Sequence, residues 1–158
     1  MQSGQTARKT QRDPNLSLQT WLHLMKTAKA VEAQVSRRLQ SKYGQSLPRF
    51  DVLSQLYRFE EKWVSTGKLA GKVMAASGNI TALLDRMEAG QLIERRASPD
   101  DRRSYQVQMT GAGKRLFLDM AEDHAQWIDA AIGGLPETDR ATLIELLKAV
   151  RTEVEKTR

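Results

Sequence analysis

The sequence contains no cysteine, which excludes disulfide bonds, thiol redox chemistry and thiolate metal ligands together. Aromatic residues make up only 6% of the 158 residues. No apolar run approaches the roughly 18 residues that a membrane-spanning helix requires. The first 15 residues lack the apolar stretch of a secretory signal, and we interpret 1–15 as a disordered, mildly basic arm. These absences predict a cytoplasmic location and no membrane partner.

Catalytic and metal-binding patterns are also missing. The only two histidines, His23 and His124, are not accompanied by an acidic cluster of metal-ligand spacing. A hydrolase would need a nucleophile beside a base, and the sequence offers neither a cysteine nor a Gly-flanked serine for that role. The sequence therefore predicts a protein that is not an enzyme and holds no metal or cofactor.

Charge is present in excess and is unevenly distributed. The net charge is +6, and the sequence pI is near 9.8. Residues 1–115 hold 20 Lys and Arg against 10 Asp and Glu, whereas residues 116–158 hold 5 against 9. The first part thus carries a net +10 and the second a net −4. This separation favours a polyanionic partner for the basic part, although a solvated surface with chance asymmetry gives the same totals.

Apolar periodicity predicts several helices in the first 90 residues. A long helix over 18–43 ends at Gly44, and a second helix begins at Ser46 with Pro48 in its first turn. Ser65 or Thr66 can cap a short helix that ends at Met74. Ser77 can cap the next helix, which ends near Gly90.

The remaining chain predicts a hairpin followed by two helices. QLIERR and SYQVQM alternate as strands do, and ASPDDRR supplies the proline and aspartates of a turn. Thr110 then caps a long helix that GGLP interrupts. The final helix carries an apolar stripe of Leu143, Leu146, Leu147, Val150 and Val154. Exposed apolar stripes on the first and last helices would need a partner to cover them.

This order of elements predicts a mainly α fold with a small β-hairpin, namely a winged helix-turn-helix with dimerisation helices at both ends. In such a fold the second helix of the helix-turn-helix enters the major groove of DNA. Its exposed polar residues are the expected DNA contacts: Ser77, Asn79, Thr81 and Arg86. Ser and Asn also cap ordinary surface helices, so this interpretation depends largely on the hairpin that follows.

The turn of the hairpin would form the wing. Arg95, Arg102 and Arg103 are the expected DNA contacts there, and Asp101 is expected to fix an arginine and shape the loop. An arginine suits a narrow minor groove, where the negative potential is enhanced. Which wing arginine enters that groove stays open, and a solvated charge run is the alternative reading of the segment.

Residues 77–117 resemble the MarR family of bacterial transcriptional regulators. The resemblance rests on Thr81, on Asp85-Arg86-Met87-Glu88, on Leu92-Ile93-Glu94-Arg95-Arg96, on Asp101-Arg102-Arg103, and on Met109-Thr110 through Gly113. Two departures stand out. Ala82 occupies a position that is often basic, and Gln91 replaces the glycine usually found before Leu-Ile, with Gly90 displaced by one residue.

The resemblance implies a single domain over 16–158, with the winged helix-turn-helix at about 46–110. It implies dimerisation helices at about 16–44 and 111–157, a homodimer, and a double-stranded DNA operator that is pseudo-palindromic. It further implies a nucleoid-associated repressor in a bacterial cytoplasm that a small molecule releases from DNA. A ligand-independent DNA-binding or architectural protein is the alternative function.

The expected effector is an aromatic carboxylate or its acyl-CoA thioester, held between the first two predicted helices. The residues that could line such a cleft are Trp21, His23, Met25, Arg49, Phe50 and Tyr57. Trp21, Met25 and Phe50 are equally suited to an apolar core, which is the commoner use of such residues.

Overall fold

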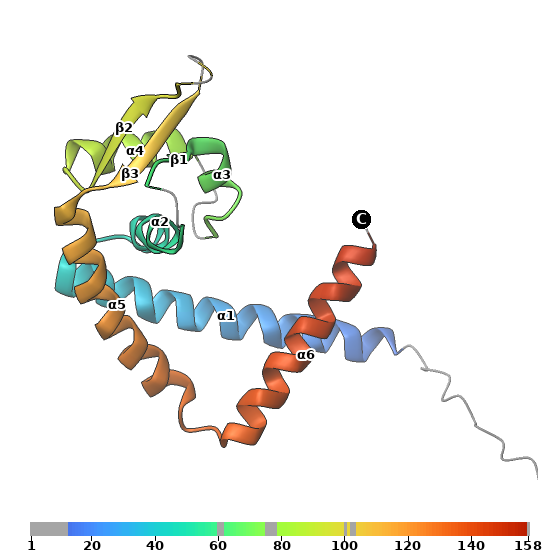
Figure 1. Cartoon of the computed structure of the whole chain (residues 1–158). Coiled ribbons are helices and arrows are strands. Elements are labelled where there is room, and N and C mark those ends of the chain that lie inside the picture. Colours follow the sequence, from blue (N-terminus) through green and yellow to red (C-terminus); the bar gives the residue numbers. More distant parts are fainter. Residues whose placement is uncertain (1–12, 60–61, 75–78, 100, 102–103, 158) are drawn as a thin grey trace, which may run out of the picture. The chain divides into compact units, whose positions relative to one another are not determined.

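Side-chain caps set the beginnings of the helices in the computed structural model, which describes residues 13–59, 62–74, 79–99, 101 and 104–157. Ser46 Oγ accepts the N–H of Arg49, and Thr110 Oγ1 accepts the N–H of Gly113. Both caps are confirmed as the sequence predicted them. The elements are α1 (Pro14–Tyr43), α2 (Leu47–Arg58), β1 (Val64–Ser65), α3 (Thr66–Ala70), α4 (Ile80–Ala89), β2 (Ile93–Ala97), β3 (Tyr105–Met109), α5 (Gly111–Ile132) and α6 (Glu137–Lys156) (Figure 1).

The predicted hairpin is confirmed and belongs to a three-stranded antiparallel sheet of order β1-β3-β2. β2 and β3 pair from Ile93↔Met109 at the root of the hairpin to Ala97↔Tyr105 near its tip. β1 adds a short third strand through Val64↔Val107, which the sequence did not predict. A two-residue strand has no alternation to detect, so its pairing is decided by the fold around it.

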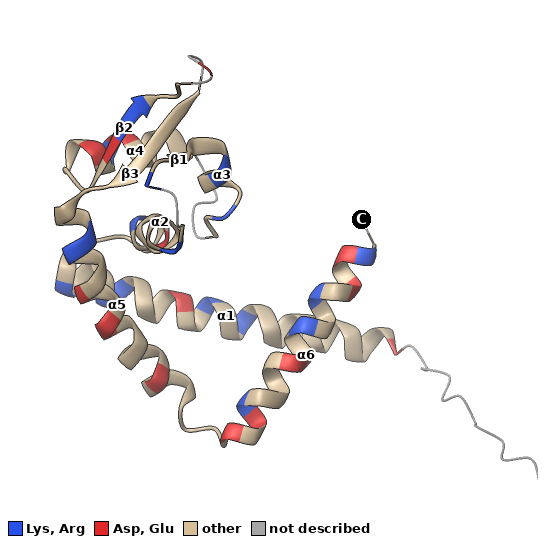
Figure 2. Cartoon of the chain, in the orientation of Figure 1, with Lys and Arg blue, Asp and Glu red and all other residues tan. Residues whose placement is uncertain are grey.

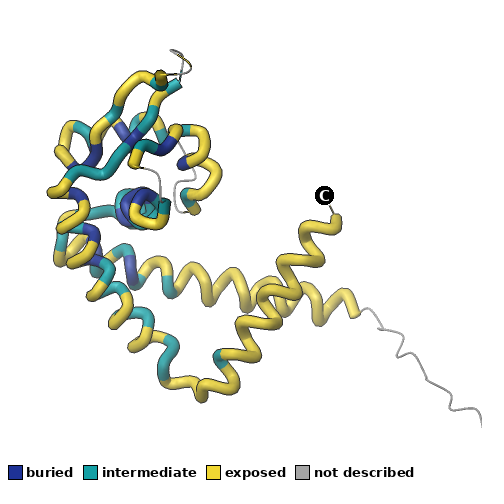
Figure 3. The backbone as a smooth tube through the Cα atoms, viewed as in Figure 1, coloured by how far each residue is buried: buried dark blue, intermediate teal, exposed yellow. Residues whose placement is uncertain are grey.

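Residues 47–110, here called the winged-helix lobe, bury an apolar core between α2, α3, α4 and the sheet. The side chains of this core are almost entirely removed from water: Val52, Leu53, Val64, Leu69, Leu84, Met87, Ile93 and Val107. Phe117 and Met120 of α5 are buried too, and α5 packs against α2. Figure 3 shows the buried residues of the lobe in dark blue. The lobe is therefore a rigid support for whatever α4 and the hairpin present outward.

Two predicted helix boundaries were wrong. The short helix ends at Ala70 with Gly71 as its C-cap, rather than continuing to Met74. The next helix begins at Ile80, and its cap is Asn79, whose Oδ1 accepts the N–H of Ala82. Asparagine and serine are equally good caps, so the sequence could not rank Ser77 against Asn79. Ser77 itself lies outside the described residues.

The turn after α4 explains the departure at Gln91. Gln91 has φ +56°, in the left-handed region that favours glycine. Its N–H donates to Glu88 O, and the N–H of Leu92 donates to Met87 O, a pair of bonds that defines a Schellman cap. The chain therefore forms the usual turn with a glutamine in the glycine position.

Helix α6 differs from the lobe because none of its described residues is buried. Leu146 and Val154 each expose 60% of their surface, and Figure 3 shows α6 exposed along nearly all of its length. The chain divides into two units, Met1–Gln34 and Val35–Arg158, so that α1 runs through the boundary. In the first unit Leu16, Leu18 and Trp21 are also more than half exposed. No described helix is long and apolar enough to span a membrane.

Candidate nucleic-acid interface

The first turns of α4 present small polar side chains to solvent. Asn79 and Thr81 are exposed, as is Arg86 one turn further along, while Leu83 and Leu84 point into the core. Ala82, at the position that is often basic in similar proteins, is half-buried. Exposed hydroxyl and amide groups at a helix N-terminus can bond phosphate oxygens or base edges, and an exposed guanidinium such as that of Arg86, in the last turn of α4, can bond them too. Asn79, Thr81 and Arg86 are thus exposed to solvent, and their assignment as DNA contacts stays a prediction.

The backbone at Met74, after α3, is held by α2. Asp51 Oδ2 accepts the N–H of Met74 at 2.5 Å, and Asp51 Oδ1 accepts from Gln55 Nε2 at 3.4 Å. A carboxylate from the core-packed α2 therefore fixes the backbone at Met74, between α3 and α4. This interaction was not predicted from the sequence, because nothing in the local pattern pairs position 51 with position 74.

The hairpin tip is closed by main-chain hydrogen bonds. The N–H of Ser98 donates to Ser104 O at 2.8 Å, and Ser104 donates through both N–H and Oγ to the carbonyl of Asp101. Asp101 thus shapes the loop through its backbone. Arg102 and Arg103 lie outside the described residues, so their roles and the role of the Asp101 carboxylate stay predictions.

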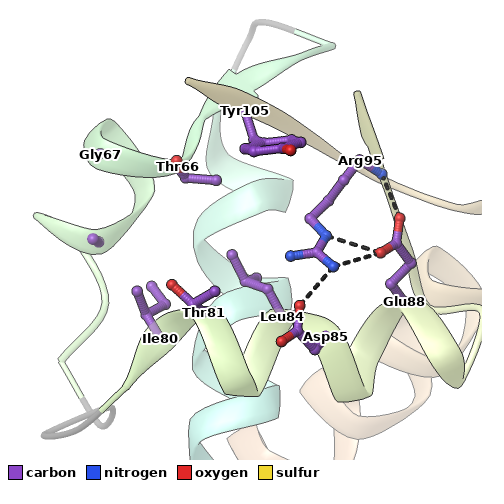
Figure 4. Close-up of a pocket in the computed structure, with 10 residues that line it drawn as sticks. Thr66, Gly67, Ile80, Thr81, Leu84, Asp85, Glu88, Arg95 and Tyr105 are labelled. Carbon is purple, nitrogen blue, oxygen red and sulfur yellow. Dashed lines mark hydrogen bonds and ion pairs between the residues drawn. The ribbon is translucent and has the colours of Figure 1, made fainter. Parts of the chain in front are cut away.

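Arg95 ties the hairpin to α4. Its Nε and Nη2 donate to Glu88 Oε2 at 2.9 and 2.6 Å, and its Nη2 lies 2.6 Å from Asp85 Oδ1 (Figure 4). The hydrogen bond to Glu88 contributes most to raising the pKa of Arg95, so the guanidinium is firmly charged. Figure 2 shows the acidic segments of α4 beside the basic part of β2. The assignment of Arg95 as a DNA contact stays a prediction, and in the free chain this guanidinium holds two carboxylates.

A groove of about 580 Å³ separates α3 and α4 from the hairpin. Thr66, Thr81 and Tyr105 face it, and the Arg95 ion pairs form one side (Figure 4). The described residues contain no group of three His, Cys, Asp or Glu that could hold a metal ion. The groove therefore offers hydroxyl groups and paired charges.

A second arginine of β2, Arg96, lies on the opposite face of the sheet. Its guanidinium carbon is 4.2 Å from the centre of the Trp63 ring, and its Nε donates to Gln106 Oε1 at 2.9 Å. Strand alternation alone would have placed Arg96 opposite Arg95. The stacking on Trp63 could not be predicted, since it depends on the strand order.

The predicted effector residues are divided between the two units. Trp21, His23 and Met25 are exposed residues of the first unit. In the second unit Phe50 is buried, and its ring centre lies 5.8 Å from that of Phe117. Phe50 therefore serves the core, which was the alternative reading of this residue.

The other two predicted effector residues also have partners inside the second unit. Tyr57 is half-exposed, and its ring centre lies 5.0 Å from that of Phe117. Arg49 Nη1 donates to Gln45 Oε1 at 3.2 Å. Phe117 thus joins Phe50 and Tyr57 in one aromatic cluster. The assignment of all six residues to an effector site stays a prediction.

Comparison with known proteins agrees with this geometry. The sequence profile of the MarR family matches residues 46–105, which covers most of the winged-helix lobe. The HTH-type transcriptional regulator MhqR of Bacillus subtilis is 32% identical over 134 residues, covering 85% of this chain and 90% of MhqR.

Two solved structures show the same fold. A MarR family regulator from Streptomyces coelicolor, solved in complex with DNA, has a TM-score of 0.78 at 18% identity, covering 92% of this chain and 91% of its own. BpsR of Bordetella bronchiseptica, described with regulation of its DNA binding by 6-hydroxynicotinic acid, has a TM-score of 0.72 at 20% identity, covering 84% and 98%. The matching profile over the lobe and the extended identity with MhqR establish that this chain belongs to the MarR family of DNA-binding transcriptional regulators.

Proposed function

We propose that the protein is a repressor that binds a pseudo-palindromic operator as a homodimer and leaves it when a small aromatic acid or its acyl-CoA binds. The observation that carries the proposal is the exposed start of α4 beside a projecting hairpin. A recognition helix gives sequence preference through base edges, and a wing gives affinity through phosphates or the minor groove. The assignment of the protein to the nucleoid of a bacterial cytoplasm belongs to the same proposal.

Homodimer formation is supported by the apolar surface of α6. Leu143, Leu147 and Val150 expose between 36% and 43% of their surface, and Leu146 and Val154 expose more. Such a continuous apolar stripe is unfavourable in water unless another surface covers it. A second copy offers an identical stripe, and a two-fold axis through it would double the recognition helices.

Release by an aromatic acid is supported by the half-buried Arg49 and the exposed Tyr57 of α2, and by the acid named for BpsR. A ligand shifts DNA affinity only if it binds the free and DNA-bound conformations unequally. Titration of hydroxybenzoates, cinnamates and their CoA thioesters into an operator complex tests this part. Failure of all of them to release DNA would favour the ligand-independent alternative.

DNA readout is tested by comparing two double variants on operator and mixed-sequence duplexes over a salt series. Asn79→Ala with Thr81→Ala should mainly reduce the preference for the operator, by about 1–3 kcal/mol for each base that is no longer read. Arg102→Ala with Arg103→Ala should weaken binding to both duplexes. It should also make the slope of log affinity against log salt shallower by about 0.9 for each phosphate that is no longer neutralised.

Asp101→Ala is the control for the wing, since it keeps both arginines and removes only a loop side chain. It should weaken binding less than the double arginine variant. A double arginine variant with unchanged affinity and salt slope would show that the hairpin turn is a solvated loop. A double α4 variant with unchanged operator preference would remove α4 from base recognition.

A further inference from the structure

The outer face of the hairpin carries two polar rungs of opposite charge. Glu94 pairs with Gln108 and Arg96 pairs with Gln106 in the strand register. Gln108 Nε2 donates to Glu94 Oε2 at 2.9 Å, and Arg96 Nε donates to Gln106 Oε1 at 2.9 Å. The acidic rung is nearer the root of the hairpin and the basic rung nearer its tip. The positive end of this face therefore adjoins the loop that is proposed to enter DNA.

Arg96 is held in one orientation by Trp63. Trp63 immediately precedes β1, and β3 lies between β1 and β2 in the sheet. The Arg96 guanidinium therefore extends across β3, over Gln106, to lie 4.2 Å from the centre of the indole ring. A flexible arginine normally loses much rotamer freedom when it binds an anion. Stacking on Trp63 removes part of that freedom in the free protein.

The remaining hydrogen-bond donors of Arg96 are suited to binding an anion. Its Nε is satisfied by Gln106, while no described residue accepts a hydrogen bond from its Nη groups. Arg96 is exposed, although its guanidinium lies over the Trp63 ring. A guanidinium fork with free Nη edges matches the two oxygens of a phosphate. Arg95, the preceding residue, differs because Glu88 and Asp85 already occupy its donors.

We propose that Arg96, with Trp63 as its platform, is a preformed binding site for a DNA backbone phosphate beside the minor groove. The proposal rests on the proposed insertion of the wing into that groove. Arg96 lies one residue before the last paired rung, Ala97↔Tyr105, and a strand advances about 3.3 Å per residue. Because the minor groove is only about 6 Å wide, a side chain just behind an inserted loop faces the phosphates that border it. In the free chain Arg95 thus holds two carboxylates of α4, while Arg96 offers its Nη groups to the DNA.

Three substitutions separate the charge from the platform. Arg96→Gln keeps a planar group over Trp63 and removes the charge. It should lower affinity for operator and mixed-sequence duplexes alike, by about tenfold for each subunit that loses one charge-assisted hydrogen bond. The salt slope should fall by about 0.9 per subunit. Arg96→Lys and Trp63→Leu keep the charge, so they should retain most of the slope and still bind DNA more weakly, because they disturb the fork geometry or its orientation.

Arg115→Gln is the matched control, since Arg115 is an exposed arginine near the start of α5, at the root of the hairpin. It should leave the salt slope unchanged. Thermal unfolding of every variant identifies any loss of folded protein. An Arg96→Gln variant that loses thermal stability but keeps the wild-type slope would show that Arg96 merely covers Trp63, which overturns the proposal.

DNA binding by the wild-type protein distinguishes a failure of the Arg96 site from a failure of the proposed function. If wild-type protein binds both duplexes and Arg96→Gln binds them with the same affinity and slope, only the Arg96 site is overturned. If the slope falls for Arg96→Gln and not for Arg115→Gln, the site is supported. If wild-type protein binds neither duplex, DNA binding through the wing and the Arg96 site are overturned together.

Discussion

The winged-helix lobe and helix α6 use apolar residues in opposite ways. In the lobe Leu53 and Val107 are fully buried, whereas in α6 Leu146 and Val154 expose 60% of their surface. Both regions show regular apolar spacing in the sequence. The difference is that the lobe folds its apolar faces against each other, while α6 has an apolar face and no described element that buries it. The lobe should therefore be stable by itself, and α6 should gain stability only from a partner.

The largest effect on stability is expected at Gly113, where the start of α5 packs against the winged-helix lobe. A Cβ there would lie 2.1 Å from the carbonyl oxygen of Leu92, which is backbone and cannot move aside cheaply. We expect Gly113→Ala to reduce the free energy of unfolding by about 3 kcal/mol or more, since α5 must separate from the turn after α4. Urea denaturation measures it. Gly134→Ala is the control, because a Cβ at Gly134 has nothing within 4 Å. Equal stability of the two variants would contradict the packing.

The next effect concerns α6 and its proposed partner. Replacing Leu147 and Val150 by aspartate should abolish dimers, because an unpaired charge buried in an interface is strongly unfavourable. The lobe should stay folded, so circular dichroism should still show helix at low protein concentration. Lys148→Asp with Thr152→Asp is the control on the other side of the helix. Sedimentation that shows an intact dimer in the first variant would place the interface elsewhere.

The hairpin and two of the helix caps were predictable from the sequence, whereas the cap of α4 was not. Ser46 and Thr110 were predicted as caps because a cap depends on residues three positions apart, and the hairpin was predicted from alternation. The cap of α4 was misplaced, since Ser77 and Asn79 suit the role equally. Local patterns decide such features only when one candidate is present.

Interactions between distant segments could not be predicted from the sequence. Arg95 could have been placed toward α4 from the burial of Ile93 two residues earlier, because alternate residues share a face. Its Asp85 and Glu88 partners and the Trp63 platform of Arg96 depend on how α4 and β1 pack, which no periodicity encodes. The exposed stripe of α6 was visible in the sequence, and its partner was not.

A smaller effect is expected in the turn that completes α4 within the lobe. Gln91 has φ +56°, which disfavours a side chain, while Gly44 after α1 has φ +63°. Gln91→Gly should therefore stabilise the protein by about 0.5–1 kcal/mol, and the reverse change Gly44→Gln should destabilise it by a similar amount. Thermal unfolding measures both. A loss of stability on Gln91→Gly would mean that the glutamine side chain makes up for its backbone conformation.

The smallest effect is expected at His124, where α5 leaves the core of the lobe. Its ring centre lies 4.9 Å from that of Phe50, and burial lowers the pKa of His124. The folded state therefore binds a proton less readily than the unfolded chain, whose histidine pKa is about 6.5. Stability should be complete above that pH, should fall as the pH drops below it, and should level off below the lowered folded pKa. The neighbouring Asp123 titrates at lower pH, since hydrogen bonds from Lys42 and Tyr43 lower the pKa of its carboxyl. Urea denaturation between pH 5 and pH 8 should thus show a shallower pH dependence for His124→Gln than for the wild type, and equal slopes would show that this imidazole is solvated in the folded protein.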